Sequence, residues 1–151
     1  MNLDLLVRTL GDLGQPTFRE RQVWRWTAQG AAGFDTMTNL PRAVRAELAD
    51  AVPFSTLTLE RQARSRDGTV KALFHTHDGR PVEAVLMTYN DGRRSLCLSS
   101  QSGCPLTCTF CATGQMRFAR NLTASEILDQ ALHFRRGAGA GTPQRVDHAV
   151  F

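Results

Sequence analysis

The sequence predicts an α/β fold in three parts: a small N-terminal helical domain, an antiparallel β meander, and the start of a partial (β/α) barrel. Three observations support this prediction. Residues 2 to about 52 repeat apolar positions with the 3.6-residue period of helices, and residues 55 to 100 change to the two-residue period of strands. After residue 100, a loop, a helical pattern and a final apolar run follow one another, which is the order of a βαβ unit.

The first part, residues 1–53, is predicted to contain three short helices. In the first helix, apolar residues share one face: Leu3, Leu6, Val7, Leu10 and Leu13. Thr17 is followed three residues later by Glu20, a capping-box pattern that opens a second helix, which should end near Gly30. Pro41 suits the first turn of a third helix, whose inner face carries Val44 and Leu48.

The second part, residues 54–90, together with the residues up to 99, reads as a meander of strands. Three Asp-Gly pairs are typical of hairpin turns: Asp67-Gly68, Asp78-Gly79 and Asp91-Gly92. They separate candidate strands at residues 57–65, 69–76, 81–88 and 93–99. Each strand should therefore pair with the next one in antiparallel fashion.

The third part, residues 91–151, contains the βαβ unit. Thr123 and Glu126 form a second capping-box pattern, which opens a helix over residues 124–136 with Ile127, Ala131 and Phe134 on one face. A Gly-Ala run at residues 137–141 should be a loop, and residues 146–151 read as a strand. One βαβ unit can neither close a barrel nor cover both faces of its sheet, so we expect the sequence to be the N-terminal portion of a longer protein.

The composition is typical of a soluble globular protein, with 42% hydrophobic and 21% charged residues. The net charge of +4 suits a polyanionic partner such as RNA, because phosphate contacts supply most sequence-independent affinity. Trp24 and Trp26 are compatible with base stacking, but tryptophans in so short a helix are more typical of a core. No apolar stretch approaches the ~20 residues that span a bilayer, so we expect no membrane association.

Three cysteines form the most specific motif of the sequence. Cys104, Cys108 and Cys111 have the spacing C-x3-C-x2-C. Three thiolates this close together can hold three irons of a [4Fe–4S] cluster and leave the fourth iron open for another ligand. An open iron is what the reductive cleavage of S-adenosylmethionine (SAM) requires, and this spacing is the signature of the radical SAM superfamily.

The four cysteines are also compatible with two other uses. Together with Cys97 the triplet could form a structural zinc site, although such sites favour two close pairs separated by a long loop. A disulfide framework is disfavoured because the N-terminus does not resemble a signal peptide, so we expect a cytoplasmic protein with reduced thiols. The spacing favours cluster ligation over both.

The motifs around the cysteines extend the match beyond the superfamily. Residues 96–104, Ala112-Thr-Gly-Gln-Met116 and Arg120-Asn-Leu-Thr123 together closely resemble the RlmN family of dual-specificity 23S rRNA and tRNA adenine-C2 methyltransferases. Upstream, residues 34–41 look like the signature of that family's helical domain. Residues 67–74 and 82–85 look like its hairpin and the strand before its barrel.

The resemblance implies a mechanism and roles for single residues. Cys104, Cys108 and Cys111 would ligate the cluster, SAM would bind its open iron, and Phe110 would pack near the SAM adenine. Cleavage of SAM at the cluster would give a radical that acts on a methyl group carried by a second cysteine. The carbon radical formed on that methyl group would then add to C2 of adenine. Cys97 would then attack the sulfur of that cysteine, forming a disulfide that releases the product. Glu83 matches a proton-accepting glutamate.

Other implications concern partners and alternatives. The family resemblance implies 23S rRNA and tRNA as substrates, a reducing electron donor such as flavodoxin, and a monomer. The methyl-carrying cysteine matches no residue of this sequence, so the 151 residues alone should not turn over. Two further functions were considered: methylation of C8 of the same rRNA adenosine by a sister family, and a non-catalytic, zinc-stabilised RNA-binding module.

Several candidate site residues also allow an interpretation without a functional role. Cys97 could be an ordinary buried thiol, since free cysteine is among the most buried residue types. Glu83 could equally be a solvated strand residue, or it could be buried with Val85 and Met87, with which it should share a sheet face; burial would raise its pKa and suit a base. Arg117 and Arg120 could contact RNA phosphates or SAM, or could simply be solvated.

Overall fold

A computed structural model describes residues 1–137 and 145–151 of the chain. These residues divide into two compact units. The first comprises residues 1–56 and 131–145, and the second comprises residues 57–130 and 146–151. The Gly-Ala run predicted as a loop lies largely outside the described residues.

The N-terminal unit contains the three predicted helices and a short 3-10 turn. They are α1 (Leu3–Asp12), α2 (Phe18–Ala28), η1 (Phe34–Thr36) and α3 (Arg42–Ala51). Their apolar faces meet in one core, as the 3.6-residue period predicts. Its members include Leu6, Leu10, Val23, Phe34, Met37, Leu40, Val44, Leu48 and Val52. The helical prediction for this part of the chain is confirmed.

Local details of these helices differ from the prediction. Asn2 caps α1, because its Oδ1 accepts a hydrogen bond of 3.0 Å from the Leu5 amide. Thr17 precedes α2 as predicted, but its side chain makes no capping hydrogen bond. Its backbone is already helical, with φ −56° and ψ −26°, whereas a capping residue is usually extended. Trp26 packs against the core, and its indole N–H donates to Asn39 Oδ1 at 2.7 Å.

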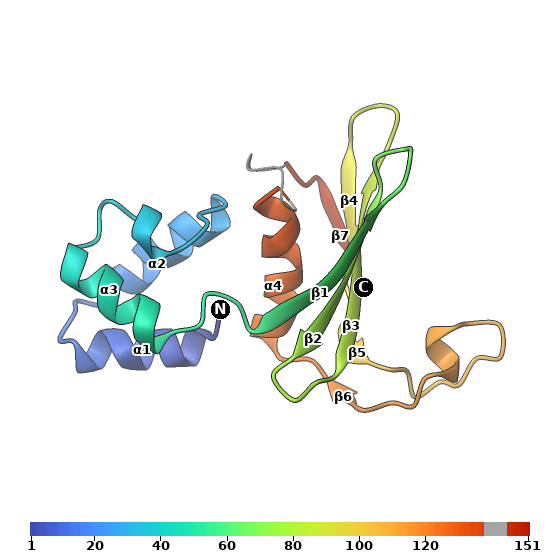
Figure 1. Ribbon diagram of the computed structural model, residues 1–151, viewed down its shortest axis with the longest axis horizontal. Helices are drawn as coiled ribbons and strands as arrows, with labels where there is room; N and C mark the ends of the chain where they lie inside the picture. Colours follow the sequence, from blue (N-terminus) through green and yellow to red (C-terminus); the bar gives the residue numbers. More distant parts are fainter. Residues whose placement is uncertain (138–144) are drawn as a thin grey trace. The chain divides into compact units, whose positions relative to one another are not determined.

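The second unit is built on a five-stranded sheet in the order β1-β2-β3-β4-β7 (Figure 1). Its strands are β1 (Leu57–Arg64), β2 (Val70–Thr76), β3 (Pro81–Thr88), β4 (Arg94–Cys97) and β7 (His148–Val150). The first four are antiparallel neighbours, so the predicted meander is confirmed. The pairing of β7 with β4 is parallel, as a βαβ unit requires.

All three predicted hairpins close through the same three-residue loop. In each loop a glycine with positive φ follows an aspartate: Gly68, Gly79 and Gly92. The glycine amide donates to the carbonyl three residues earlier, which is a type I turn followed by a left-handed residue. The aspartate side chain then stabilises the turn; Asp67 Oδ1, for example, accepts a 2.9 Å hydrogen bond from the Thr69 amide.

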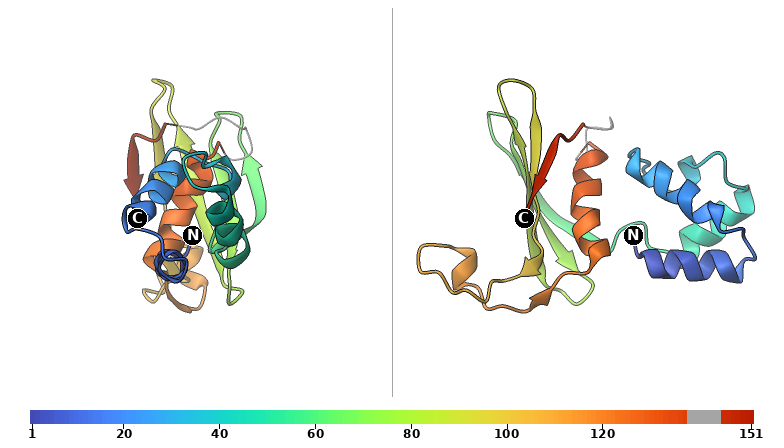
Figure 2. Two further views of the ribbon diagram at one scale, coloured as in Figure 1. Left: turned by 90° about the vertical axis from the view of Figure 1, so that its left-hand side faces the viewer. Right: turned by 180° about the vertical axis from the view of Figure 1, so that it is seen from behind.

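The two faces of the sheet differ in what covers them. One face carries the buried side chains of the strands: Val70, Ala72, Phe74, Val82, Ala84, Leu86 and Leu96. Helix α4 spans Ala124–Arg135, and its residues up to 130 belong to the second unit. This part of α4 lies on one side of the sheet. The loop of residues 103–119, between β5 (Gln101–Ser102) and β6 (Arg120–Asn121), extends on the other side (Figure 2).

The second predicted capping box is present at the start of α4. The Thr123 amide donates to Glu126 Oε2 at 2.8 Å, and the Glu126 amide donates to Thr123 Oγ1 at 3.2 Å. Gln130 is fully buried because its amide group exchanges two 2.9 Å hydrogen bonds with the Ser99 backbone. Of the predicted apolar face, Phe134 is buried, while Ile127 and Ala131 are only half-buried. Across residues 1–137 and 145–151, no helix has the length and apolar character needed to cross a bilayer.

Candidate active site

The register of β2, β3 and β4 places Glu83 and Cys97 on the same face of the sheet. Glu83 lies opposite Leu73, and Val85, two residues further along β3, lies opposite Cys97. Residues that are directly opposite or two apart on a strand point to the same side of a sheet. This face is opposite to the one that carries the buried side chains, so it is open to bind a ligand.

Glu83 is held by an ion pair and not by burial. Its Oε1 lies 2.7 Å from Lys71 Nζ on β2, and the side chains are about half exposed (50% for Glu83 and 54% for Lys71). Of the two interpretations of Glu83, the structure therefore fits the solvated strand residue. Val85 and Met87 share its face but are themselves only half-buried, because the core lies on the other face of the sheet.

Cys97 is the last residue of β4 and its thiol is exposed. The alternative interpretation of Cys97 as a buried structural thiol is therefore wrong. Its neighbours on the two adjacent strands are Val85 and Val150. An exposed thiol on a rigid strand is sterically free to react with a group that approaches this face.

The three cysteines of the triplet lie on the loop that follows β5, and all are half-buried free thiols. The Cys111 amide donates to the Cys108 carbonyl at 3.2 Å, and the Gln115 amide donates to the Cys111 carbonyl at 3.2 Å. These two bonds form successive turns, which fix Cys108 and Cys111 relative to each other. Cys104 stands apart, before the left-handed residue Thr107 (φ 49°), a strained conformation for a β-branched side chain.

Two glycines allow the cysteine loop to pack tightly. A Cβ atom on Gly114 would lie 2.7 Å from the Cys108 carbonyl oxygen and 2.8 Å from its nitrogen. A Cβ atom on Gly103, whose φ is +72°, would lie 2.2 Å from the Arg117 carbonyl oxygen. Both distances are shorter than any van der Waals contact, so only glycine fits at these two positions.

The loop offers the right donors for an iron–sulfur cluster but does not gather them. Within the part of the chain that the structure describes, no three His, Cys, Asp or Glu side chains lie close enough together to hold a metal ion. Three free thiols on one eight-residue segment are nevertheless the ligand type and number that a cluster with one open iron needs. The residues therefore fit the cluster in kind and number, and cluster binding stays a prediction.

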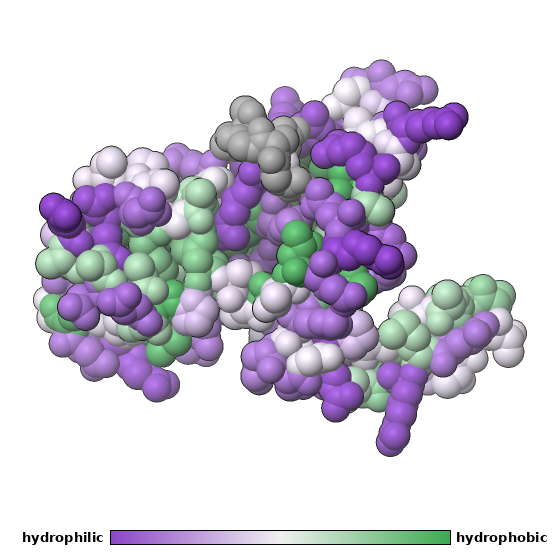
Figure 3. Space-filling model, in the orientation of Figure 1, coloured by the Kyte–Doolittle hydropathy of each residue, from purple (hydrophilic) through white to green (hydrophobic). Residues whose placement is uncertain are grey.

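Phe110 lies at the exposed tip of the same loop. Its side chain is 92% exposed, and that of Leu106 is 75% exposed. Figure 3 shows apolar surface gathered on this loop. Phe110 is not among the residues that line the cavity of about 420 Å³ beside this loop, and its contact with the adenine of SAM stays a prediction.

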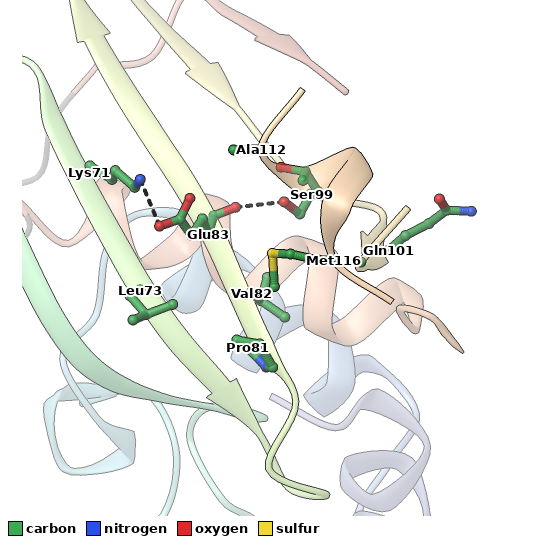
Figure 4. Close-up of a pocket in the computed structure, with 11 residues that line it drawn as sticks. Lys71, Leu73, Pro81, Val82, Glu83, Ser99, Gln101, Ala112 and Met116 are labelled. Atoms are coloured by element: carbon green, nitrogen blue, oxygen red, sulfur yellow. Dashed lines mark hydrogen bonds and ion pairs between the residues drawn. The ribbon is translucent and has the colours of Figure 1, made fainter. Parts of the chain in front are cut away.

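A cavity of about 420 Å³ lies between the cysteine loop and the sheet face (Figure 4). Lys71, Leu73 and Glu83 form its strand side, and Ser99 Oγ, which donates to the Glu83 carbonyl at 2.7 Å, lies at its end. The loop side comprises residues that flank the cysteines: Gly103, Ala112, Thr113 and Met116. The volume is within the usual range for small-molecule and cofactor sites.

Arg120 has a structural role beside this cavity. Its guanidinium donates to Glu126 Oε1 at 2.7 Å and to Asp78 Oδ1 at 2.8 Å, joining the start of α4 to the β2–β3 hairpin. These bonds hold the pKa of both carboxyl groups below their ordinary values and raise the pKa of Arg120. The Arg120 side chain, 27% exposed, is thus engaged by two carboxylates of the second unit. Arg117, by contrast, is exposed.

Sequence reasoning missed Lys71 as part of this site. The signal was present, because the Asp67-Gly68 and Asp78-Gly79 turns fix the register of β2 against β3. Strand alternation then places Lys71 on the face of Glu83. Ser99 could not be found in this way, because it lies beyond the end of β4, where alternation no longer applies.

Three comparisons with known proteins agree with this architecture. Residues 1–53 match the family described as the ribosomal RNA large subunit methyltransferase N-terminal domain. The chain is 48% identical over 99% of its length to a dual-specificity RNA methyltransferase RlmN from Anaeromyxobacter sp. (strain Fw109-5), covering 41% of that protein. It is 47% identical over 89% of its length to a probable dual-specificity RNA methyltransferase RlmN from Deinococcus deserti, covering 39%.

A solved structure shows the same fold. The crystal structure of a radical SAM methyltransferase from Sphaerobacter thermophilus matches all of this chain and 44% of its own, with a TM-score of 0.84 and 42% identity. The chain thus spans about two fifths of the length of the relatives that it matches.

Proposed function

We propose, because the chain belongs to the RlmN family of RNA methyltransferases, that the whole protein is a radical SAM enzyme that methylates C2 of adenosine in 23S rRNA and in tRNA. The observation that carries this proposal is the cavity between the cysteine loop and the face of Glu83. Glu83, the predicted proton acceptor, lines this cavity together with residues that flank the predicted cluster ligands.

The proposal assigns the cofactors to the cysteine loop. Cys104, Cys108 and Cys111 would hold a [4Fe–4S] cluster, and the exposed ring of Phe110 is available to contact the adenine of SAM. When bound, the reduced cluster supplies the electron that splits SAM into methionine and a carbon radical. Such chemistry is needed because adenine C2–H is neither acidic nor nucleophilic enough for polar methyl transfer.

The chain's own residues then act on the adenosine from the sheet face. Glu83, oriented by Lys71, would accept the proton that the methylated adenine loses. Once the carbon on the methyl-carrying cysteine has bonded to C2, Cys97 would attack the sulfur of that cysteine. The S–S bond would form as the S–C bond breaks, and the released carbon would take up a proton and become the methyl group of the product. All four cysteines of this chain are free thiols, and no residue of it matches that second cysteine.

We also propose a domain organisation for the chain and a redox partner for the enzyme. Residues 1–53 would form a helical accessory domain, residues 54–90 a β-hairpin extension, and residues 91–151 the first part of a radical SAM domain. In that domain, β4, α4 and β7 would begin the barrel. The enzyme would be a cytoplasmic monomer, reduced by a donor such as flavodoxin.

The test uses the whole protein, kept under anaerobic conditions with SAM, a reductant and a 23S rRNA fragment. Mass spectrometry of nucleosides should find 2-methyladenosine. Detection of 8-methyladenosine instead would favour the C8-directed alternative. Absence of any methylated adenosine, with zinc in place of iron in the protein, would favour the RNA-binding module.

A further inference from the structure

We propose that Arg61 binds a backbone phosphate of the RNA beside the adenosine that Glu83 and Cys97 face. This inference rests on the function proposed above and adds a substrate contact to it. Arg61 lies on β1, a strand at the edge of the sheet, and its side chain is exposed. RNA can therefore approach it without displacing any other part of the second unit.

The register of the sheet places Arg61 in one row with the proposed proton acceptor. Arg61 lies opposite Leu73, and Leu73 lies opposite Glu83. Neighbouring strands are separated by 4.7–4.9 Å, so the backbones at Arg61 and Glu83 are roughly 10 Å apart. This separation is comparable to that between a phosphate and the far edge of its own base.

A second, smaller cavity connects these residues. It has a volume of about 220 Å³ and is lined by Arg61, Ala63, Lys71, Leu73 and Glu83. Three of these residues also line the larger cavity beside the cysteine loop: Lys71, Leu73 and Glu83. The two cavities thus share the centre of the sheet face, and the smaller one extends it towards β1.

The charges in the smaller cavity single out Arg61. The charge of Lys71 is compensated by Glu83 at 2.7 Å. The side chain of Arg61 makes no hydrogen bond and no ion pair with any residue that the structure describes. The planar guanidinium of Arg61 can bind two phosphate oxygens at once. Leu73 separates Arg61 from the carboxylate of Glu83, which would repel a phosphate.

Arg64 provides a matched control on the same strand. It is also exposed, and its side chain likewise has no hydrogen bond or ion pair within the described residues. Its partner on β2 is Val70, which is buried on the opposite face of the sheet. Arg61→Gln and Arg64→Gln therefore remove the same charge from the same strand but from opposite faces.

The experiment measures binding of a short adenosine-containing RNA hairpin to the whole protein by fluorescence anisotropy at several salt concentrations. Arg61→Gln should weaken binding about three- to tenfold at low salt and reduce the salt dependence by about one phosphate contact. Arg61→Lys should recover part of the affinity, and Arg64→Gln should behave like the unchanged protein. In methylation assays, Arg61→Gln should raise KM for RNA without changing kcat or KM for SAM.

Equal binding by the Arg61→Gln and Arg64→Gln variants would overturn the inference, as would an effect of Arg61→Gln on KM for SAM alone. These outcomes are separate from a failure of the proposed function. If the unchanged protein binds the hairpin without methylating it, the function fails while the binding comparison still decides the role of Arg61.

Discussion

Lys71 Nζ lies 2.7 Å from Glu83 Oε1, across the neighbouring strands β2 and β3, and both residues line the cavity of about 420 Å³ beside the cysteine loop. Because both side chains are about half exposed, this ion pair contributes less than about 1 kcal/mol to stability. Its effect is to hold the carboxylate in one orientation on the face that also carries Cys97.

Replacement of Glu83 by Gln should lower the methylation rate of the whole enzyme by about 10²-fold or more, because the amide cannot accept the proton. Thermal unfolding should change little, since the carboxylate is half exposed. Glu60→Gln is the matched control, because Glu60 is also an exposed strand carboxylate with a basic partner, His75 at 3.1 Å. Equal activity of the two variants would remove Glu83 from the mechanism.

Replacement of Cys97 by Ala should leave the stability of the protein unchanged, because the thiol is exposed and unbonded to another cysteine. The proposed mechanism predicts that this variant keeps the methylated RNA covalently attached, since nothing attacks the methyl-carrying cysteine. Denaturing gel electrophoresis with labelled RNA should show a protein–RNA band. Normal release of methylated RNA by Cys97→Ala would contradict the role of Cys97.

Replacement of Gly114 by Ala should disturb the cysteine loop, because the new Cβ would lie 2.7 Å from the Cys108 carbonyl oxygen. We expect the iron content after reconstitution to fall by at least about half, with an unchanged far-ultraviolet spectrum. Gly11→Ala is the control: a Cβ there meets nothing within 4 Å, so it should keep full iron and gain up to about 1 kcal/mol. Full iron in Gly114→Ala would show that the loop opens when the cluster binds.

Replacement of Arg120 by Met should destabilise the protein by about 2–3 kcal/mol at neutral pH, because Glu126 is left buried without its cation. Arg120 holds the pKa values of Asp78 and Glu126 below their ordinary values. The stabilisation is therefore present above about pH 4 and is lost as the pH falls through the lowered folded-state pKa values.

Urea unfolding between pH 7 and pH 2 checks this linkage. The unchanged protein should lose stability as the pH falls below about 4, and Arg120→Met should show a flatter profile. Arg93→Met, which breaks the exposed pair of Arg93 with Asp91, should have little effect. Parallel profiles for the unchanged protein and Arg120→Met would mean that other groups set the acid limit.

Much of the fold follows from local chemistry that can be read in the sequence. The three Asp-Gly pairs each form a hairpin because glycine tolerates the left-handed conformation that the turn requires. Asp67 and Asp91 also accept the amide of the residue two positions later, whereas Asp78 accepts from the Thr76 hydroxyl. Thr123 and Glu126 form their capping box because Thr123 immediately precedes α4. The same Thr-x-x-Glu pattern at Thr17 gives no capping hydrogen bond from the Thr17 side chain, because that residue adopts helical dihedral angles.

The arrangement of the site was less predictable. Strand alternation correctly places Glu83 with Val85. Alternation alone does not tell which face of a sheet is covered, so it left open whether Glu83 is buried or solvated, and the structure shows it exposed. The cysteine spacing indicates cluster ligation, yet the sulfur atoms of a loop are gathered by the metal that they bind. Tertiary contacts such as Arg120 with Asp78, 42 residues apart, have no local signal at all.

The most direct measurement is the iron and sulfide content of the whole protein after anaerobic reconstitution, in the unchanged form and in single Cys→Ala variants. The unchanged protein and Cys97→Ala should both be brown and hold about four irons per chain, while variants of Cys104, Cys108 or Cys111 should lose the cluster. A colourless protein that holds zinc, and loses it when Cys97 is replaced, would contradict a three-cysteine cluster and the radical chemistry proposed for this family member.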